Sequence, residues 1–322
     1  MDLQYTYAVA RVRAKEVTLF NAAVIDQLLA CRNYEQCLQF LIEKGWGDAD
    51  TPLEAEAILA CESEKTWAEV RDLVKDMSVF EVLNYPNLFH NLKAAIKLVC
   101  SGSERTDVFY PDTVPSSAFL LEKVKERAFG DLPVMMAKPA EEAYEALLHG
   151  RDGQLCDMII DKACLQAIRQ AGKESGEEVI RSYSDSYVAI ADIKIAVRCA
   201  KTGKSADFTK RALADCASLS TEALARAAAN GVDAIREYLK TTAYAGAAEA
   251  LEQSPSVFER WCDDRIIDSV RPQKYESFSV GPVVAYALAR ENEIKTVRII
   301  LSGRLNGLSV ASIRERVRKM YV

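Results

Sequence analysis

The sequence predicts an all-α protein, and three observations support that class. Proline and glycine are scarce, with 9 and 14 among 322 residues, and long helices tolerate this better than a sheet with many tight turns does. Apolar residues recur at helical spacing, and helix-start and helix-end signals accompany them. No segment shows the convincing period-two alternation of a half-buried strand.

Four segments carry clear helix signals. Thr51–Glu54 is a capping box with proline at the first helical position, and it predicts a helix that runs through Val74. A helix is also expected over Lys138–Gly150, which has a proline near its start, an acidic first turn and a closing glycine. Ser220–Ala229 is rich in strong helix formers, and Ser254–Trp261 again begins with serine and proline. The segments expected to be non-helical are Gly102–Val114, Arg151–Leu155 and Pro272–Gly281.

An internal repeat is visible in three stretches that align without gaps, about 100 residues apart. They are Asn91–Gly102, Asp192–Gly203 and Asn292–Gly303. Each begins with Asn or Asp, ends with glycine, and carries a basic residue flanked by apolar ones. The basic residues are Lys97, Arg198 and Arg298, and the apolar residues just before them are Ile96, Val197 and Val297. A second helical element recurs between these stretches at Tyr34–Leu41, Ala140–Leu147 and Val232–Leu239.

This repeat predicts three similar helical domains. Their expected bounds are 1–105, 106–207 and 208–322, the last with a C-terminal tail. The chain begins and ends with partial units. If the three units form a closed ring, every unit packs against a neighbour on both sides, whereas an open array would leave two sides exposed. We therefore expect the N-terminal helix around Ala10–Leu19 to pack near Ile294–Ile300, in a pseudo-threefold arrangement. Ile96, Val197 and Val297 should occupy equivalent buried positions.

No catalytic, cofactor-binding or metal-binding constellation is apparent. Gly203-Lys204-Ser205 matches the end of a nucleotide-binding P-loop, but Arg198 stands where that loop requires glycine, and the preceding residues follow helical spacing. Gly203 is therefore expected to end a helix. The histidines, His90 and His149, lie far apart, and no Cys/His cluster suggests zinc. We predict no catalytic residue, no cofactor and no metal.

Composition is that of a soluble protein. The net charge of −6 excludes a global nucleic-acid-binding field, and nine cysteines without a Cys-x-x-Cys motif fit a reducing cytoplasm. The N-terminus has no apolar signal-peptide core, and the longest apolar stretches are about half of the roughly 20 residues that span a bilayer. Charge is uneven, because Asp48–Asp76 is acidic and Glu291–Val322 is basic, which suggests different faces for different partners.

The two ends of the chain resemble a known family. "AYALARENEIKTVRIILSGRLNGLSVASIRERVRKMYV" (Ala285–Val322) is similar to the end of the C subunit of the archaeal and bacterial V-type (A-type) ATPases, the family of the eukaryotic d subunit. Tyr7–Glu16 resembles that family's opening helix. Thr296 and Ser309 depart from the family pattern, which usually has Asn and Pro there. The residues that fit it are Glu293, Lys295, Arg298, Gly303, Arg304, Gly307, Leu308, Arg314, Glu315, Arg316, Tyr321 and Val322.

The resemblance implies a mechanical part with no catalytic activity. Members of this family are funnel-shaped, with three similar helical domains, and sit over the cytoplasmic mouth of the membrane rotor ring. They receive the foot of the central stalk, the D and F subunits, and pass torque between stalk and ring during ATP-coupled proton or sodium ion transport. Such a protein is peripheral to the membrane. Lys97 and Arg198, which share the repeat position of Arg298, join the candidate interface residues. An unrelated cytoplasmic helical-repeat scaffold and a carboxylate-based helical enzyme are the alternatives.

Overall fold

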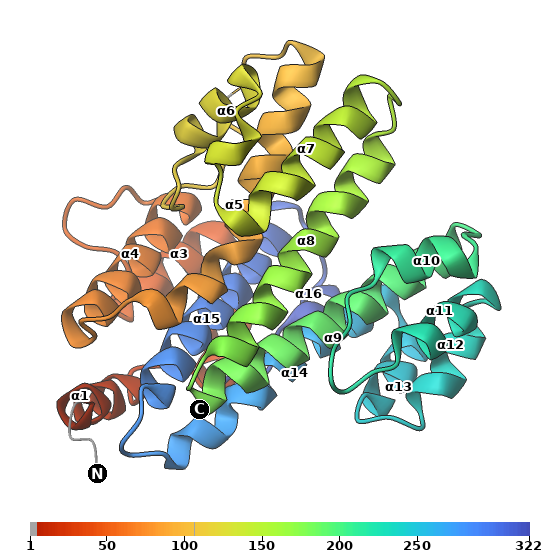
Figure 1. Cartoon of the computed structure of the whole chain (residues 1–322). Helices are drawn as coiled ribbons and strands as arrows, with labels where there is room; N and C mark the ends of the chain where they lie inside the picture. The colour runs from red at the N-terminus through yellow and green to blue at the C-terminus, as the bar shows by residue number, and fades with distance from the viewer. Residues whose placement is uncertain (1–4, 106) are drawn as a thin grey trace. The chain divides into compact units, whose positions relative to one another are not determined.

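The computed structural model describes residues 5–105 and 107–322, and every regular element among them is a helix, as predicted. Figure 1 shows these helices coloured along the chain. They form two compact units, which we name after their central helices. The α15 unit comprises Met1–Met77, Glu177–Ser186 and Leu239–Val322, and the α5 unit comprises Ser78–Gly176 and Tyr187–Tyr238. The division into three domains of about 100 residues stays a prediction.

The α15 unit is built from both ends of the chain. It also holds the first turns of α9, whose remainder belongs to the other unit. Its helices are α1 (Thr6–Glu16), α2 (Ala22–Ala30), α3 (Tyr34–Glu43), α4 (Ala55–Leu73), α13 (Ala245–Gln253), α14 (Pro255–Val270), the 3₁₀ helix η2 (Arg271–Tyr275), α15 (Gly281–Leu305) and α16 (Val310–Arg316).

The α5 unit is built from the middle of the chain. Its helices are α5 (Ser78–Ser101), α6 (Ser117–Glu126), the 3₁₀ helix η1 (Phe129–Asp131), α7 (Val134–Leu148), α8 (Gly153–Glu174), most of α9 (Glu178–Lys201), α10 (Ala206–Ala212), α11 (Thr221–Ala229) and α12 (Val232–Leu239). Helix α5 packs against α6, α7 and α8.

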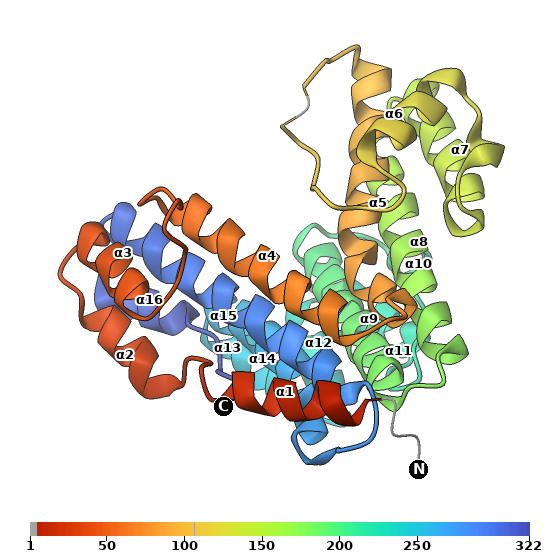
Figure 2. The same cartoon turned by 90° about the vertical axis from the view of Figure 1, so that its left-hand side faces the viewer.

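Helix α15 is the centre of its unit. Every residue from Gly281 to Arg290 is buried, and α1, α3, α4, α14 and α16 all pack along this helix. A helix that is apolar all round belongs in a core, and Val283, Val284 and Ala287 are 0% exposed. Figure 2 shows α1 lying against α15.

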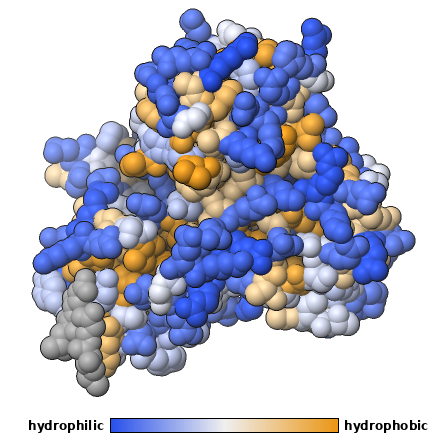
Figure 3. Space-filling model, in the orientation of Figure 1, coloured by the Kyte–Doolittle hydropathy of each residue, from blue (hydrophilic) through white to orange (hydrophobic). Residues whose placement is uncertain are grey.

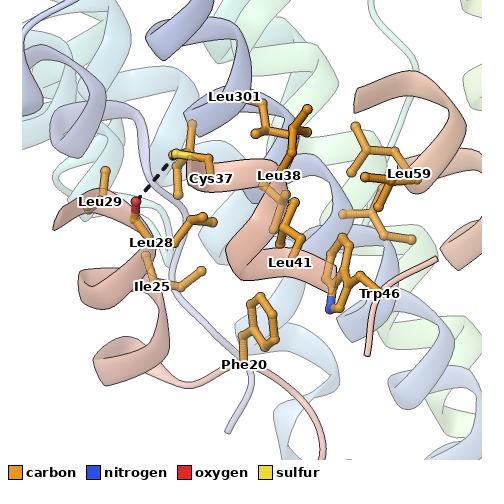
Figure 4. Close-up of a cluster of buried hydrophobic side chains, with 14 of the residues drawn as sticks. Phe20, Ile25, Leu28, Leu29, Cys37, Leu38, Leu41, Trp46, Leu59 and Leu301 are labelled. Atoms are coloured by element: carbon orange, nitrogen blue, oxygen red, sulfur yellow. Dashed lines mark hydrogen bonds between the residues drawn. The ribbon is translucent and has the colours of Figure 1, made fainter. Parts of the chain in front are cut away.

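The far end of α15 closes a second part of the same core. Phe20, Leu28, Cys37 and Leu41 pack there with Val297 and further apolar residues, as Figure 4 shows in part. The Phe20 and Trp46 rings stack with centroids 5.1 Å apart. Each fully buried Leu in this cluster contributes about 1.5–3 kcal/mol relative to an exposed one.

The two ends of the chain therefore pack together as expected, but the predicted bounds shift: α1 ends at Glu16, and it is Phe20, after the helix, that packs with Ile294, Val297 and Ile300. Helix α1 contacts α15, and the backbone N–H of Phe20, just after α1, donates to Glu293 Oε1 at 2.8 Å. Arg13 extends the junction, since its guanidinium donates to the carbonyls of Gln273 and Glu276. The pseudo-threefold arrangement stays a prediction.

The three repeat stretches lie in the three longest helices, α5, α9 and α15, which have 24, 24 and 25 residues. Ile96, Val197 and Val297 are buried as predicted, at 0%, 5% and 0% exposure. Gly102 and Gly203 follow the ends of α5 and α9 with φ of 66° and 64°, a left-handed conformation that glycine adopts without penalty.

The residue that opens each stretch has the same role, and we call Asn91, Asp192 and Asn292 the anchor residues. All three side chains are buried and bind the backbone of a segment that follows their helix. Asn91 pairs with both the N–H and the carbonyl of Tyr110, at 2.8 and 2.9 Å. The Ala214 N–H donates to Asp192 Oδ1 at 3.0 Å, and Asn292 Nδ2 donates to the Lys319 carbonyl at 3.0 Å. The three repeats thus share a contact as well as a pattern.

Helices α11 and α14 begin as expected. Ser220 and Ser254 are their N-caps and accept from the N–H groups of Ala223 and Val257. Among the segments expected to be non-helical, Gly102–Val114 has no helix in its described residues. The prediction for Arg151–Leu155 is wrong in part, since α8 begins at Gly153. The prediction for Pro272–Gly281 is also wrong in part, since this segment begins within η2.

Two predicted helix starts are wrong. Helix α4 begins at Ala55, not at the capping box, because Thr51 Oγ1 bonds the Asp48 carboxylate at 2.6 Å in a preceding turn. Helix α7 begins at Val134, so Pro139 lies inside it. The chain already enters α7 at Pro133, whose carbonyl accepts from the Ala137 N–H at 3.0 Å.

The surface is mainly polar. On the face that Figure 3 shows, hydrophilic side chains cover most of the molecule and hydrophobic ones form smaller patches. Among the described residues, no helix combines the length and the apolar character that crossing a bilayer requires.

Candidate interaction surfaces

Glu293, the first residue of the C-terminal motif, lies at the centre of a buried ion-pair network. Arg290 donates to Glu293 Oε2 at 2.7 Å, to Glu62 Oε2 at 2.6 Å and to Thr66 Oγ1 at 3.3 Å. Its guanidinium lies over the Trp46 ring, 5.3 Å from the centroid. Every nitrogen of the guanidinium therefore has a partner within the α15 unit.

The electrostatics of this network keep the guanidinium charged. Burial disfavours the charged guanidinium, but the carboxylates of Glu293 and Glu62 outweigh burial and raise the pKa of Arg290. Burial raises the pKa of Glu293, and Arg290 offsets part of that rise. Such a network specifies how α4, α15 and the segment after α1 fit together, and it is costly to break.

Lys295 and the C-terminal tail converge on Asp263 of α14. Lys295 Nζ and Arg318 Nε both lie 2.7 Å from Asp263 Oδ2. Burial opposes ionisation, but these two cations hold the pKa of Asp263 below its ordinary value. The N–H of Lys319 also donates to Asp264 Oδ1 at 2.7 Å. The basic residues after α16 therefore attach the tail to α14.

Gly303, Arg304 and Gly307 shape the end of α15. Gly303 is inside the helix, and a Cβ there would lie 2.6 Å from Ile313 Cγ1, so α16 can approach only a glycine. Arg304 donates to the carbonyl of Leu29. Gly307, with φ of 66°, takes the place that Gly102 and Gly203 have in the other repeats. Gly303 thus differs from Gly102 and Gly203, which follow their helices, because α15 continues to Leu305.

Ser309 and Thr296 have clear local roles. Ser309 is the N-cap of α16 and accepts from the Ser312 N–H. Thr296 is buried and donates to the Asn292 carbonyl at 2.8 Å.

Arg298 lies in an open groove of about 490 Å³, which we call the α15 groove. Arg298 is half exposed and pairs with Glu56 Oε2 at 3.0 Å. That pair joins the acidic and basic stretches of the sequence. The groove is lined by Pro255, Ser256, Glu259, Arg298, Ile299, Ser302, Gly303, Leu308, Ile313, Arg316 and Arg318.

Lys97 lies in a second open groove, the α5 groove, of about 920 Å³. Lys97 pairs with Asp157 of α8, and Lys93, one turn earlier, pairs with Asp161 at 2.6 Å. The groove is lined by His90, Lys93, Ala94, Lys97, Leu98, Cys100, Ser101, Ser103, Arg105, Val108, Leu147, Leu148 and Arg151. Arg198, the third basic repeat residue, is exposed on α9 and lines neither groove.

The structure thus gives the candidate residues different surroundings. Glu293, Lys295 and Arg304 bond within the α15 unit, whereas Lys97 and Arg298 line open grooves. Gly303 does both, because it packs on Ile313 of α16 and also lines the α15 groove. Sequence reasoning missed Arg290 and Glu62, whose pairing spans 228 residues. A charged residue within the apolar run before Glu293 was the available signal. Within the described residues, no group of three or more His, Cys, Asp or Glu side chains could hold a metal.

Comparison with known proteins gives relatives over nearly the whole chain. The C subunit of the V-type sodium ATPase of Enterococcus hirae is 20% identical over 317 residues, which cover 96% of this chain and 97% of that protein. The C subunit of the A-type ATP synthase of Methanocaldococcus jannaschii is 23% identical over 359 residues, covering 96% and 85%. That of Halobacterium salinarum is 25% identical over 346 residues, covering 96% of each. A family model described as the ATP synthase (C/AC39) subunit matches residues 8–316, and the chain therefore belongs to that family.

Proposed function

We propose that this chain is the non-catalytic adaptor of the central stalk in a rotary V/A-type ATPase. It links the D and F subunits of the stalk to the membrane rotor ring and transmits torque for ATP-coupled proton or sodium ion transport. The observation that carries the proposal is the family match over residues 8–316, together with relatives whose names make them the C subunit of such machines. The chain acts at the cytoplasmic face, peripheral to the membrane.

The packing of the α15 unit suits a mechanical role. A torque-bearing part must resist opening between its first and last elements. Here α1 packs on α15, Glu293 accepts from the Phe20 N–H, and Arg290 joins α15 to Glu62 of α4. Buried charge pairs of this kind resist separation, because opening would leave a charge without its partner.

The alternatives have less support. An unrelated helical-repeat scaffold is set aside because the chain belongs to the C/AC39 family. We infer that the chain is a structural part of the complex and not a catalyst from its membership of a family named for a subunit of the ATP synthase.

The test is a pull-down of the tagged chain from its own cells under non-denaturing conditions. We expect the D and F subunits and the protein of the rotor ring to co-purify with it. Recovery of the chain without any other part of the ATPase, from a preparation in which the complex itself stays assembled, would refute the proposal. A catalytic test is complementary: the purified chain should hydrolyse no ATP.

A further inference from the structure

The α5 groove and the α15 groove are lined by the same positions of the internal repeat. Lys97, Leu98 and Ser101 line the first groove, and Arg298, Ile299 and Ser302 line the second. Each set holds the seventh, eighth and eleventh residues of its stretch, counted from the anchor residue Asn91 or Asn292. Each groove thus presents a cation, an apolar side chain and a hydroxyl from the last turns of a long helix.

Both grooves are basic, although the chain has a net charge of −6. The side chains that line the α5 groove include Lys93, Lys97, Arg105 and Arg151, as well as His90, and no Asp or Glu. Lys93, Lys97 and Arg105 each pair with an aspartate outside this lining. The α15 groove has one carboxylate, Glu259, and three arginines, of which Arg318 is nearly buried and already paired with Asp263. This charge is complementary to an acidic segment.

Each groove also has an apolar floor. Ala94, Leu98, Val108, Leu147 and Leu148 line the α5 groove, and Ile299, Leu308 and Ile313 line the α15 groove. Leu308 is 37% exposed at the end of α15, so it can be covered further. An apolar floor with a basic rim fits a peptide segment that carries both carboxylates and an apolar side chain.

The ion pairs that Lys97 and Arg298 already make, with Asp157 and Glu56, are exposed and leave both cations accessible. Lys97 and Asp157 keep 44% and 39% of their side-chain surface, and Arg298 and Glu56 keep 52% and 76%. Ion pairs this exposed contribute little, about 0–1 kcal/mol, so each cation can turn to an incoming carboxylate at small cost.

We propose that the two grooves are equivalent docking sites for one repeated segment, acidic and with an apolar side chain, presented by identical copies of the protein that forms the rotor ring. This inference rests on the proposed function. A ring built from copies of one protein offers the same segment many times. A single-copy stalk protein offers any given segment once. Two grooves of the same construction therefore match the ring better than they match the stalk.

The experiment measures binding of the full-length chain to the detergent-solubilised ring and, separately, to the purified D and F subunits. Lys97→Glu and Arg298→Glu should each weaken ring binding about 10-fold, and the double variant more than either, because charge reversal opposes an acidic segment at each groove. Lys97→Arg should bind as the parent does. Stalk binding should stay unchanged in all variants.

Lys138→Glu and Arg71→Glu are the matched controls. Lys138 lies on α7 and Arg71 on α4, and both are exposed, ion-paired and outside the two grooves. Their ring binding should equal that of the parent, and circular dichroism should give equal helix content for every variant. Parent-like ring binding by the double variant overturns the inference, as does an equal loss in the controls. Both results leave the proposed function standing if the parent binds ring and stalk. Failure of the parent to bind either partner refutes the proposed function itself.

Discussion

The two units solve the burial of a carboxylate in different ways. In the α15 unit, Glu293 has a guanidinium at 2.7 Å and the Phe20 N–H at 2.8 Å. In the α5 unit, Asp192 accepts one N–H, from Ala214, and its Oδ2 has no hydrogen-bond partner among the described residues. Both side chains are 0% exposed. Two carboxyl groups that are equally buried can therefore differ in their partners: one has a guanidinium partner, and the other has no cation bonded to it in the described part of the chain, so that burial favours its protonated form.

The titration of Asp192 follows from this. Burial raises its pKa to about 7, the Ala214 N–H and Lys162 offset part of that rise, and Asp215 adds to it. A protonated Asp192 has an O–H group that can donate a hydrogen bond, as the Nδ2–H groups of Asn91 and Asn292 do. The neutral anchor residues and the protonated acid are thus chemically alike.

The largest effect is expected from breaking the Glu293 network. Arg290→Met would leave Glu62 and Glu293 buried without a guanidinium and should cost about 3–5 kcal/mol in urea unfolding. Lys65→Met removes the other cation on Glu62, at 2.8 Å but 42% exposed, and should cost less than about 1 kcal/mol.

A rescue distinguishes lost charge balance from lost packing. Adding Glu62→Gln and Glu293→Gln to Arg290→Met removes both negative charges and keeps oxygen acceptors, including the one for the Phe20 N–H. We expect most of the lost stability to return. If the single variant were as stable as the parent, the network would be unimportant for the fold.

The next prediction compares the loss of stability at equivalent buried positions of the three repeat helices. Ile96→Ala, Val197→Ala and Val297→Ala each remove buried methyl groups, and each should cost roughly 1–3 kcal/mol. Exposed Val134, at 95%, provides a control, because Val134→Ala should change stability by less than about 0.5 kcal/mol. A loss at one or two of the three positions only would show that the repeat positions are not equivalent.

Asp192→Asn should have an effect that is present at high pH and nearly absent at low pH. The pKa of Asp192 is about 7 in the folded protein and 3.8 ordinarily, so the folded state holds a proton that the unfolded state releases. The stability of the parent is then full below pH 4 and falls as pH rises towards 7. The variant lacks this loss and should be more stable than the parent by roughly 1–3 kcal/mol at pH 8 and by little at pH 4.

The reverse substitution sharpens the same point. Asn91→Asp places a carboxylate where Asn91 donates to the Tyr110 carbonyl, and it should create a new loss of stability as pH rises. Thermal melts of both variants at pH 4, 6 and 8 measure the two slopes. A parent-like slope in Asp192→Asn would mean that another group titrates.

Local signals predicted much of the fold. The helix caps Ser220 and Ser254, the buried positions Ile96, Val197 and Val297, and the all-α class all follow from spacing within a few turns. Local signals failed where a side chain had another hydrogen-bond partner nearby. Thr51 bonds Asp48 in a turn and therefore caps no helix. The role of Gly303 was not predictable in this way, because its closeness to Ile313 depends on α16, which lies beyond the repeat.

The candidate surfaces were less predictable, for a different reason. Arg298 and Glu56 are 242 residues apart, and Arg290 and Glu62 are 228 apart, so no spacing rule relates them. Whether a basic residue of the motif faces a groove, as Arg298 does, or pairs with Asp263 of α14 outside the groove, as Lys295 does, depends on packing. The periodicity of apolar residues shows which face of a helix is buried, but it does not show which other element packs against that face.

The smallest expected effect is none: Mg-ATP should not bind at Gly203-Lys204-Ser205. A P-loop needs free N–H groups around the phosphates. Here the N–H groups of Gly203 and Lys204 donate to the carbonyls of Ala200 and Cys199, and Ser205 caps α10 by accepting from the Phe208 N–H. Lys204 Nζ donates to Gln154 at 3.0 Å and lies over the Phe208 ring.

The same turn occurs at the end of α15 without a lysine. Gly307 and Leu308 donate to the carbonyls of Arg304 and Gly303, and Ser309 caps α16 as Ser205 caps α10. The P-loop-like letters thus belong to a turn that ends one helix and begins another, with its backbone donors already used. Isothermal titration calorimetry with Mg-ATP should give no binding heat for the parent or for Lys204→Ala. A micromolar dissociation constant that Lys204→Ala abolishes would require the turn to open, and would contradict the equivalence of the two turns.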